Sequence, residues 1–598
     1  MSAVRWRTRP SEAVPLLVDT AMGRTPADVV VRNARLVNVN TGEIEKGVDV
    51  AVRRDRIALV GDARPTIGPR TRVIDASGMY LAPGLIDSHM HIESSMLTPA
   101  QFARAVLPRG TTTVFVDPHE MGNVLGMEGV RYMLKESLGL PLKVYFTLPS
   151  CVPALPRFET AGAKIGPRDI ARALKWPHVV ALGEMMNYPG VLAADPNVLG
   201  EIEATLASGM LVEGHSPGLK GQSLSAYTAA GITSCHESTG KEEALEKLRR
   251  GMYLQIREGS AWLDLKENIR AVTEEKVDSR HVCLVTDDRD SGSLIRQGHM
   301  DHVVRRAIEE GVDPVVAIEM ATINGAEHFE MGRYLGSIAP MRSADMLLLP
   351  SLEEFKPSLV MADGRVVAQD GRLSISIPQP AIPKEMTDSI HLKRLPVPGD
   401  FSVKAGKAMG TVQVRAIGVT GGSVYTREVI EEVPVRDGEA KISLSKDLLK
   451  VAVVERHHAT GRTAVAFTTG FGFEGGAVGS TVAHDSHNLL LVGTDEKEMA
   501  FAAERVTEQG GGMLAVRNGK VLGSIRMRVA GLVSDSPVEE VSAQAEGLLE
   551  AWRRMGCRMV EPFMTMSLIT LTVLPKLRIS DRGLLDTDRF RFVEPLLG

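Results

Sequence analysis

The sequence predicts a mixed α/β protein: a central TIM-like (β/α)₈ barrel, a small flanking β-sandwich and a C-terminal α/β domain. Three observations predict this fold class. Between residues 81 and 330, short apolar runs alternate with longer helical stretches. On both sides of this segment the sequence pattern is instead typical of short strands and turns. A proline-rich stretch at 377–383 indicates a linker before the last domain, residues 384–598. A chain of 598 residues exceeds one ordinary hydrophobic core, so several domains are expected.

Residues 1–80 and 331–376 are expected to share the β-sandwich. Both stretches contain short runs in which apolar and polar residues alternate between turn residues, as in antiparallel strands. The predicted strands are 29–37, 48–52 and 56–61 before the barrel, and 338–340, 344–349 and 357–364 after it. One domain would then be built from both sides of the barrel.

Eight strand candidates lie within the barrel segment, residues 81–330. They are separated by about the length of one strand-plus-helix unit, as in a (β/α)₈ barrel. A helical stretch is predicted at 126–136, and another near 536–555 in the C-terminal domain. The alternative is a doubly wound sheet, because strand order cannot be read from one sequence. The eight candidates are 85–87, 113–116, 143–146, 179–182, 210–213, 231–234, 252–255 and 282–285.

Candidate metal ligands lie at the ends of these strands. His89 and His91 close the first run, and because a strand alternates its side chains, positions i and i+2 face the same way. Alone, the pair could be ordinary surface or core histidines. The same strand-end position is taken by further candidates after strands four, five, six and eight, and in such barrels the catalytic groups come from these ends. These candidates are Glu184, His215, His236 and Asp287.

Four imidazoles and two carboxylates suit two divalent cations bridged by Glu184; Mn²⁺, Fe²⁺ and Zn²⁺ are all chemically admissible. Coordination lowers the pKa of water from about 15.7 to about 7. Asp287 could then take the proton of the attacking water. The expected chemistry is metal-assisted hydrolysis at an sp² carbon.

The barrel segment resembles the amidohydrolase superfamily, with His-x-His on strand one, histidines on strands five and six and an aspartate on strand eight. The whole chain is similar to the bacterial adenine deaminases. The segments that carry this resemblance are 83–96, 110–113, 117–126, 149–154, 183–191, 214–219, 236–239 and 286–289, with 475–480 and 483–488 in the C-terminal domain. It implies that adenine and water give hypoxanthine and ammonia, by attack of a metal-bound hydroxide on C6. It also implies a binuclear Mn²⁺ or Fe²⁺ site, with Glu184 in the place of the carboxylated lysine that bridges the metals in many relatives.

Further residues are candidates for contacts with the substrate. His119 and Glu120, after strand two, are expected to contact the purine or the leaving group; the alternative is a salt-bridged loop pair. Asp288, Glu237 and Ser94 are candidate substrate-binding residues. For Glu237 the alternative is support of the metal ligands, and for Ser94 a cap of the following helix.

Two histidines of the C-terminal domain, His484 and His487, leave two readings open. They could form a second metal site, or belong to a loop that covers the barrel mouth or packs on a neighbouring subunit.

The sequence departs from the pattern of the similar family at two places. The segment 290–293 replaces a proline-containing loop, and Cys235 stands where an aspartate is expected. Both changes put substrate preference in doubt, so the alternative function is hydrolysis of another purine or of a cyclic amide or amidine. A catalytically inactive binding protein is a further alternative.

Composition excludes several partners. The formal net charge is −5, no run of Lys and Arg occurs, and aromatic residues make up only 4%, so nucleic acid is not expected as a partner. No apolar run approaches the roughly 20 residues needed to cross a bilayer, and the start, residues 1–7, lacks the apolar core of a secretory signal. Four widely separated cysteines indicate a reducing compartment. We expect a cytoplasmic enzyme with a small purine substrate, no membrane partner, and a homo-oligomeric state of dimer or higher.

Overall fold

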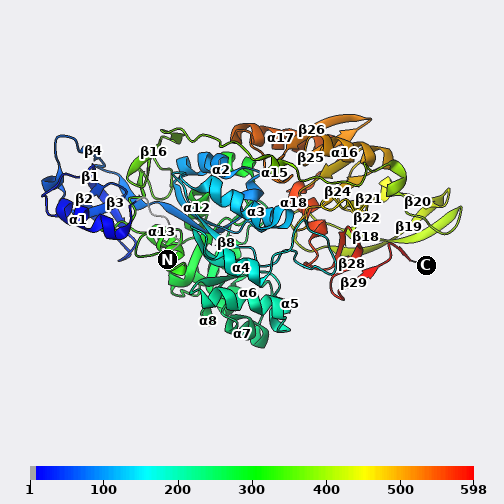
Figure 1. The fold of residues 1–598 in the computed structure, drawn as a ribbon, viewed down its shortest axis with the longest axis horizontal. Helices are drawn as coiled ribbons and strands as arrows, with labels where there is room; N and C mark the ends of the chain where they lie inside the picture. Colours follow the sequence, from blue (N-terminus) through cyan, green and yellow to red (C-terminus); the bar gives the residue numbers. More distant parts are fainter. Residues whose placement is uncertain (1–7, 598) are drawn as a thin grey trace.

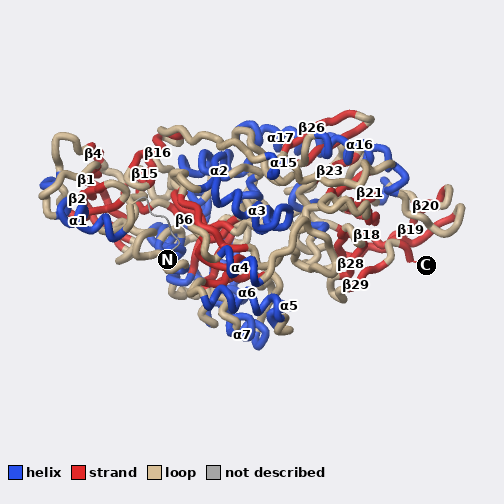
Figure 2. Tube along the Cα trace, in the orientation of Figure 1, coloured by secondary structure: helices blue, strands red, loops and turns tan. Residues whose placement is uncertain are grey.

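The computed structural model describes residues 8–597, which form an elongated molecule (Figure 1). The N-terminal strands lie at one end, the C-terminal segment at the other, and the central α/β segment, residues 85–328, between them (Figure 2). The start of the chain, residues 1–7, falls outside the described residues. Among residues 8–597, none of the helices combines the length and the apolar character that a membrane span requires.

A nine-stranded flanking sheet is built from both sides of the central segment. Strand β5 connects its two halves, because it runs parallel to β1 and antiparallel to β14. The order is β17-β16-β15-β14-β5-β1-β2-β3, with β4 beside β1, and α1 (Pro10–Ala21) packs on β3. The strands are β1 (Val29–Asn38), β2 (Glu43–Arg53), β3 (Arg56–Gly61), β4 (Arg72–Asp75), β5 (Tyr80–Pro83), β14 (Met346–Leu349), β15 (Leu359–Ala362), β16 (Arg365–Gln369) and β17 (Arg372–Leu373).

Five of the six strands predicted on the two flanks are confirmed, and the strand predicted at 338–340 is wrong. Ile338 is buried in the core of this sheet, as its apolar character suggested, but the backbone there makes turns. Pro340 has no N–H to donate to a ladder, and Met341 has a left-handed backbone with φ of 77°. The chain therefore bends where an extended strand was expected.

Strands occur at all eight positions predicted in the central segment. Five form one parallel sheet in the order β10-β9-β8-β7-β6, and three form a second, β11-β12-β13. Isolated parallel bridges, Val212 with Ile232 and Met90 with Asp287, connect the two sheets. The sixth strand is shorter and later than predicted. The eight are β6 (Leu85–Met90), β7 (Thr111–Val116), β8 (Lys143–Leu148), β9 (Val179–Met185), β10 (Leu211–Gly214), β11 (Ser234–Cys235), β12 (Tyr253–Arg257) and β13 (Val282–Val285).

Helices alternate with these strands, and several begin at capping residues. The Asp195 and Asp313 carboxylates accept backbone N–H groups at the starts of α6 and α13, whose first residues are Pro196 and Pro314. The helices are α2 (Pro99–Val106), α3 (His119–Ser137), α4 (Pro167–Ala173), α5 (Tyr188–Leu192), α6 (Pro196–Ala207), α7 (Gly221–Ala229), α8 (Lys241–Arg249), α9 (Leu265–Asn268), α10 (Arg270–Thr273), α11 (Ser291–Arg296), α12 (Met300–Glu309), α13 (Pro314–Met320) and α14 (Ile323–His328). The helix predicted at 126–136 lies within α3, which begins seven residues earlier.

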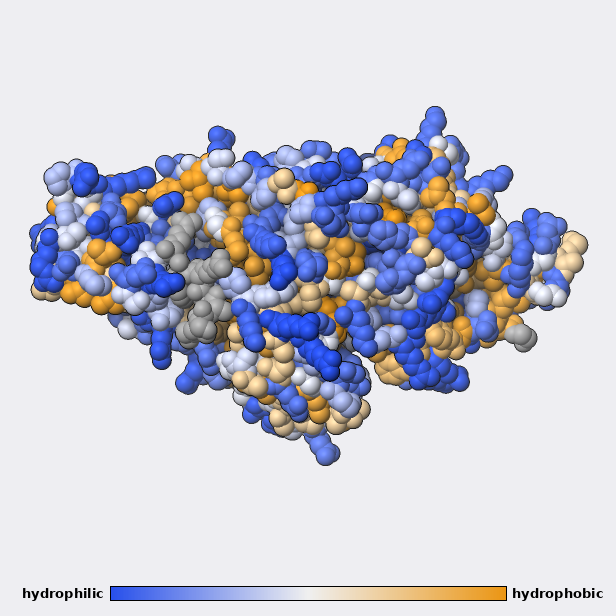
Figure 3. Space-filling model, in the orientation of Figure 1, coloured by the Kyte–Doolittle hydropathy of each residue, from blue (hydrophilic) through white to orange (hydrophobic). Residues whose placement is uncertain are grey.

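The C-terminal segment, residues 384–597, contains a ten-stranded sheet and a small three-stranded sheet. Helix α17, close to the predicted 536–555, packs against α11 and α2 of the central segment. The elements are β18 (Gly410–Gly418), β19 (Arg427–Arg436), β20 (Glu439–Ala440), β21 (Leu449–Val454), β22 (Thr463–Thr469), β23 (Ala477–Ser480), β24 (Leu489–Gly493), β25 (Gly512–Arg517), β26 (Lys520–Arg526), β27 (Leu577–Ser580), β28 (Gly583–Asp586), β29 (Arg591–Val593), β30 (Leu596–Leu597), α15 (Lys384–Thr387), α16 (Glu496–Glu508), α17 (Val538–Arg554) and α18 (Pro562–Ser567). Polar side chains cover most of the face seen in Figure 3, where apolar ones form scattered patches.

A buried ion pair ties the central segment to the flanking sheet. Lys143, the first residue of β8, places its Nζ 2.8 Å from Asp345 Oδ1 and 2.5 Å from Asp363 Oδ1. All three side chains are at most 10% exposed. Two buried carboxylates therefore share one cation at this junction.

Replacing Lys143 by methionine should destabilise the protein strongly, because it removes the buried ammonium group that both the Asp345 and the Asp363 carboxylates contact. We expect a loss of about 3 kcal/mol or more, since removal of one partner of a buried ion pair has this cost. The corresponding fall in the melting temperature is roughly 2–4 °C by differential scanning calorimetry, because the unfolding entropy of so long a chain is large. The exposed Lys266→Met is the control and should change the melting temperature little. Equal melting temperatures for the two variants would contradict this role of Lys143.

Candidate metal centre

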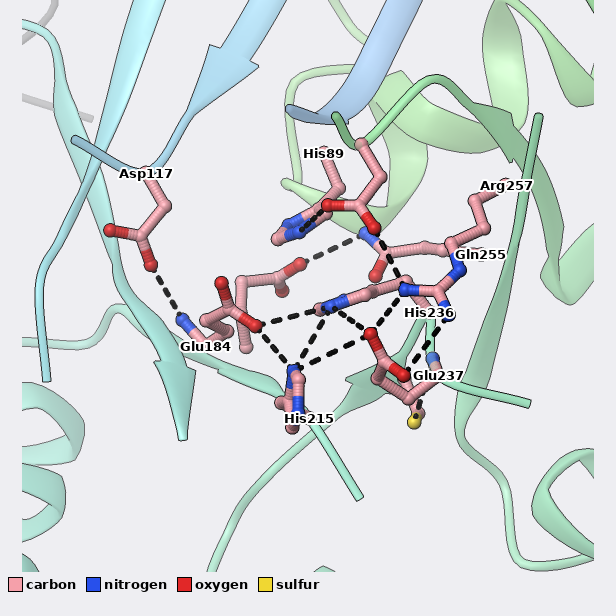
Figure 4. Close-up of polar contacts among 12 residues, drawn as sticks. His89, Asp117, Glu184, His215, His236, Glu237, Gln255 and Arg257 are labelled. Atoms are coloured by element: carbon pink, nitrogen blue, oxygen red, sulfur yellow. Dashed lines mark hydrogen bonds and ion pairs between the residues drawn. The ribbon is translucent and has the colours of Figure 1, made fainter. Parts of the chain in front are cut away.

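The six predicted ligands meet at one end of the central strands. Four of them, His89, Glu184, His215 and His236, are labelled in Figure 4. His89 belongs to β6 and His91 follows it directly, while Glu184 belongs to β9. The other three, His215, His236 and Asp287, each come within two residues after β10, β11 and β13. The shared strand-end position places all six side chains in one cluster, although they come from five strands. Their role as ligands stays a prediction.

The carboxylate of Glu184 stands between two groups of imidazoles. Its Oε2 lies 2.6 Å from His215 Nδ1 and 3.1 Å from His236 Nε2. Its Oε1 lies 3.4 Å from His91 Nε2 and 3.5 Å from His119 Nδ1. Each oxygen therefore faces its own pair of ring nitrogens, which is the arrangement required of a carboxylate shared by two cations.

Asp287 contacts His91, which lies beside Glu184 Oε1, and also His89. Its Oδ1 is 3.2 Å from His91 Nε2 and 3.7 Å from His89 Nε2. The residue has a left-handed backbone, φ 56°, a conformation that aspartate tolerates better than most residues. In this conformation its N–H donates to the carbonyl of His89 and its own carbonyl accepts from the His91 N–H. The backbone of β6 thus holds Asp287 beside the two histidines.

Asp117, which follows β7, orients two of the predicted ligands, His91 and Glu184. Its carbonyl accepts a hydrogen bond from His91 Nδ1 at 2.8 Å, so the lone pair of that ring remains on Nε2, which faces Glu184. Its carboxylate Oδ2 accepts the Glu184 N–H at 2.9 Å. A Cβ at Gly183 would lie 2.0 Å from the same oxygen, so only glycine permits this approach.

Arg257, the last residue of β12, pairs with three carboxylates. One of its terminal nitrogens donates to Asp287 Oδ2 at 2.9 Å, and Nε donates to Asp264 at 2.7 Å. Its two terminal nitrogens also contact both oxygens of Glu237, whose Oε1 is 3.7 Å from His236 Nε2. The sequence analysis missed Arg257, although it ends strand seven and the rule that found the other strand-end residues would have found it.

The residues present fit a metal site. His89 Nε2 and His119 Nδ1 are buried without a hydrogen-bond partner among the described residues. His215 Nδ1 and His236 Nε2 lie 3.3 Å apart beside the same Glu184 oxygen. Several overlapping groups of three ligand atoms lie within 4.8 Å of one another, and imidazole with carboxylate is the donor set that Mn²⁺, Fe²⁺ or Zn²⁺ binds.

A cavity of about 490 Å³, a size typical of small-molecule sites, lies next to this cluster; none of the six predicted ligands lines it, but Asp288, which follows Asp287, does. Ser94, Glu120 and Asp288 line it. Ser94 donates a hydrogen bond to Asp288, and it does not cap the following helix, because α2 is preceded by Thr98. Burial and the neighbouring Asp287 carboxylate raise the pKa of Asp288.

His119 and Glu120 are the first two residues of α3, so they do not form a loop pair. His119 Nε2 is 3.5 Å from Glu120 Oε1. The Glu120 carboxylate also contacts His484 and His487 of the C-terminal segment. The two C-terminal histidines therefore do not stand apart from the central site: their turn packs against it.

The two departures noted in the sequence lie in different places. Asp290 and Gly292 line the cavity. Cys235 is fully buried behind the histidines, where its sulfur lies 3.1 Å from Lys247 Nζ and 3.4 Å from the Ser216 N–H. Of the two changes, only the segment 290–293 borders the space open to a ligand.

This arrangement of strand-end histidines and carboxylates defines a metal-dependent hydrolase of the amidohydrolase class, and the comparisons with known proteins agree. Residues 80–367 match the amidohydrolase family, and residues 423–591 match the adenine deaminase C-terminal domain.

Curated relatives extend the match to nearly the whole chain. It is 52% identical to an adenine deaminase of Moorella thermoacetica, over 98% of this chain and 99% of the relative. It is 47% identical to adenine deaminases of Clostridium botulinum and of a Ruegeria species, in each case over 98% of both chains. The chain belongs to the adenine deaminase family of amidohydrolases.

Metal binding should release protons at neutral pH. Burial alone would lower the pKa of His215, but the carboxylates of Glu237 and Glu184 raise it to about 9. Carboxylates likewise raise the pKa of His91 and His119, against the effect of burial. At pH 7 the metal-free protein therefore holds protons that a divalent cation must displace.

Titration calorimetry with Mn²⁺ in two buffers of different ionisation enthalpy measures this release. We expect at least about one proton per chain at pH 7 and fewer at pH 9, with an apparent affinity that rises over this interval. The exposed His391→Ala should release the same number as the unmodified protein. Identical heats in the two buffers at pH 7 would show that the histidines are already neutral.

Proposed function

We propose that this protein hydrolyses adenine to hypoxanthine and ammonia. The observation that carries the proposal is the Glu184 carboxylate between two groups of histidines, beside a cavity lined by Ser94, Glu120 and Asp288. Its relatives of nearly equal length carry the name adenine deaminase, which agrees with this chemistry. In the reaction, water adds to C6, the bond from C6 to the exocyclic amine breaks, and the water supplies the new oxygen.

The proposal includes the architecture. We propose that the eight central strands close into a (β/α)₈ barrel over residues 81–330, because parallel bridges connect the two sheets at both of their edges. Residues 1–80 and 331–376 would form one β-sandwich domain, as their shared sheet supports. Residues 377–383 would be the linker to the C-terminal domain, 384–598.

Two divalent cations, Mn²⁺ or Fe²⁺ with Zn²⁺ as an alternative, would be held by the six strand-end residues. Glu184 would be shared between them, since its two oxygens face different histidines. When bound, such cations act as Lewis acids and make water acidic enough to attack at neutral pH. The ligands are His89, His91, Glu184, His215, His236 and Asp287.

The protein's own groups would move the protons. The Asp287 carboxylate takes the proton of the attacking water, and Arg257 fixes its orientation by donating to Oδ2. Glu120, with His119 beside it, contacts the amine that leaves. Asp288 and Ser94 form a hydrogen-bonded pair in the cavity wall, where they would bind the purine ring. Glu237 is the remaining candidate for a substrate contact, and its pairing with Arg257 favours a supporting role.

A second candidate is hydrolysis of another purine or of a cyclic amide or amidine. The observation that favours it is the segment 290–293, which departs from the family pattern and borders the cavity through Asp290 and Gly292.

We also propose a cytoplasmic, homo-oligomeric protein. Its four cysteines are free and buried, as in a reducing compartment. Helix α1 exposes Val14 and Val18, and its C-cap residue Met22 continues the four-residue spacing, an apolar stripe of the kind that subunit interfaces cover.

The protein loaded with Mn²⁺ should release ammonia from adenine, with about two metal ions bound per chain. Ammonia release and metal content are measured on the same sample, and adenosine is tested in parallel as the matched nucleoside. Release from adenine alone would establish a free-base deaminase. Full metal occupancy without release from adenine would contradict the proposal and direct attention to the segment 290–293.

Replacing Asp287 by asparagine should lower kcat by about 100-fold or more, because the amide cannot accept the proton. The matched control is Asp264→Asn, which removes another carboxylate bound by Arg257 but none that touches the histidines. The control should stay within several-fold of the unmodified enzyme, about the scatter of a supporting contact. Metal content is determined for both variants. An unchanged kcat for Asp287→Asn with metal bound would disprove the assigned role.

A further inference from the structure

The C-terminal segment reaches the candidate active site through one turn, residues 483–487. This turn meets the first turn of α3, where Glu120 lies 3% exposed. His487 Nε2 contacts Glu120 Oε2, and His484 Nδ1 contacts Glu120 Oε1. All three side chains border the cavity that also contains Ser94 and Asp288.

We infer that His487 is a positioning residue, which holds the Glu120 carboxylate in the wall of the cavity at the orientation that the reaction requires. The inference rests on the proposed function, in which Glu120 contacts the departing amine. It means that the active site is completed by the C-terminal segment and is not contained in the central strands alone.

The hydrogen bonds of His487 fix which nitrogen carries its proton. The Ala483 N–H donates to Nδ1 at 3.1 Å, so Nδ1 presents its lone pair. In the neutral ring the proton is then on Nε2, which faces Glu120. A nitrogen that donates its proton to a carboxylate cannot bind a metal at the same time. This geometry favours a hydrogen-bond donor over a metal ligand, although Glu120, His484 and His487 lie close enough to be mistaken for a metal site.

The turn that carries His487 is itself held rigidly. Arg456, fully buried, donates from Nε to the His487 carbonyl and from its terminal nitrogens to the carbonyls of Ser389 and Ala530. His457 Nε2 lies 2.6 Å from the carbonyl of Ser486. A fixed donor is what a positioning role requires, because a flexible one would follow the carboxylate and could not orient it.

Glu120 keeps the capacity to bind a substrate while it is held. Each carboxylate oxygen can accept two hydrogen bonds. Oε1 faces His484 and, at 3.5 Å, His119, whereas Oε2 faces His487 alone among the described residues. The second lone pair of Oε2 is available to the exocyclic amine of an amidine substrate. Without His487, the side-chain rotamers of Glu120 would no longer be restricted at Oε2, and the carboxylate would leave its reactive orientation more often.

The test compares His487→Met, which removes the donor at similar size, with His487→Gln, which keeps an N–H donor. In the Mn²⁺-loaded enzyme we expect His487→Met to lower kcat for adenine by about 10–100-fold with a smaller effect on KM, since a misplaced group costs about this much. His487→Gln should recover most of that loss. His458→Met, which removes another histidine contact between the segments, to the Ala161 carbonyl, should leave kcat unchanged.

A double-mutant cycle with Glu120→Gln decides whether His487 acts through Glu120. If it does, the double variant Glu120→Gln/His487→Met will be no slower than Glu120→Gln, within about twofold. Three results would each overturn the inference. They are losses in kcat that multiply in the double variant, a kcat of His487→Met near that of the unmodified enzyme, and loss of a bound metal ion in His487→Met.

Crystal structures of the two variants give a readout that does not depend on activity. Glu120 should keep its place in His487→Gln and turn away in His487→Met. If the unmodified enzyme released no ammonia from adenine, the proposed function would fail. The position of Glu120 would still decide the role of His487, and an unmoved carboxylate in His487→Met would refute it.

Discussion

The structure of the site depends on one buried carboxylate, that of Glu184, which lies between two groups of histidines. Burial by itself would raise the pKa of Glu184, yet the imidazoles of His236 and His215 hold it well below its ordinary range, so the group is charged in the protein interior. A buried charge is tolerated only when several partners surround it. Glu184 meets this condition because the end of β9 lies between the strands that bring histidines from either side.

The residues around Glu184 serve that same requirement. Asp117 accepts the Glu184 N–H, and Gly183 leaves the space for this contact. Arg257 neutralises carboxylates that would otherwise repel one another around Asp287. The centre is therefore a charge-balanced cluster in which each acidic side chain has a nearby cation or imidazole, and orientation and charge are provided by the same contacts.

How far the sequence predicts this site depends on whether a feature is local. His89 and His91 could be placed on one face of a strand because the alternation of side chains is a property of adjacent residues. Glu184 and Asp287 could be expected beside them because parallel strands end at one edge. The strand at 338–340 was wrong because Pro340 changed the backbone while the apolar pattern persisted.

Contacts between residues far apart in the sequence could not be predicted, because local patterns do not record them. Glu120 and His487 are 367 positions apart, and no local pattern records that the turn at 483–487 packs on α3. His119 was expected near the substrate, but its approach to Glu184 at 3.5 Å depends on where α3 begins. Such pairings follow from the packing of the segments, which strand and helix periodicities do not encode.

The flanking sheet has a consequence for biosynthesis. Strand β5, Tyr80–Pro83, pairs with β14, Met346–Leu349, so the sheet begun near the N-terminus lacks four of its strands until the ribosome has added the whole central segment. During that interval the edge of β5 is unpaired and its apolar face is uncovered, a state that favours aggregation. The central segment must therefore fold, or be held by a chaperone, before the first strands of the chain can complete their own sheet.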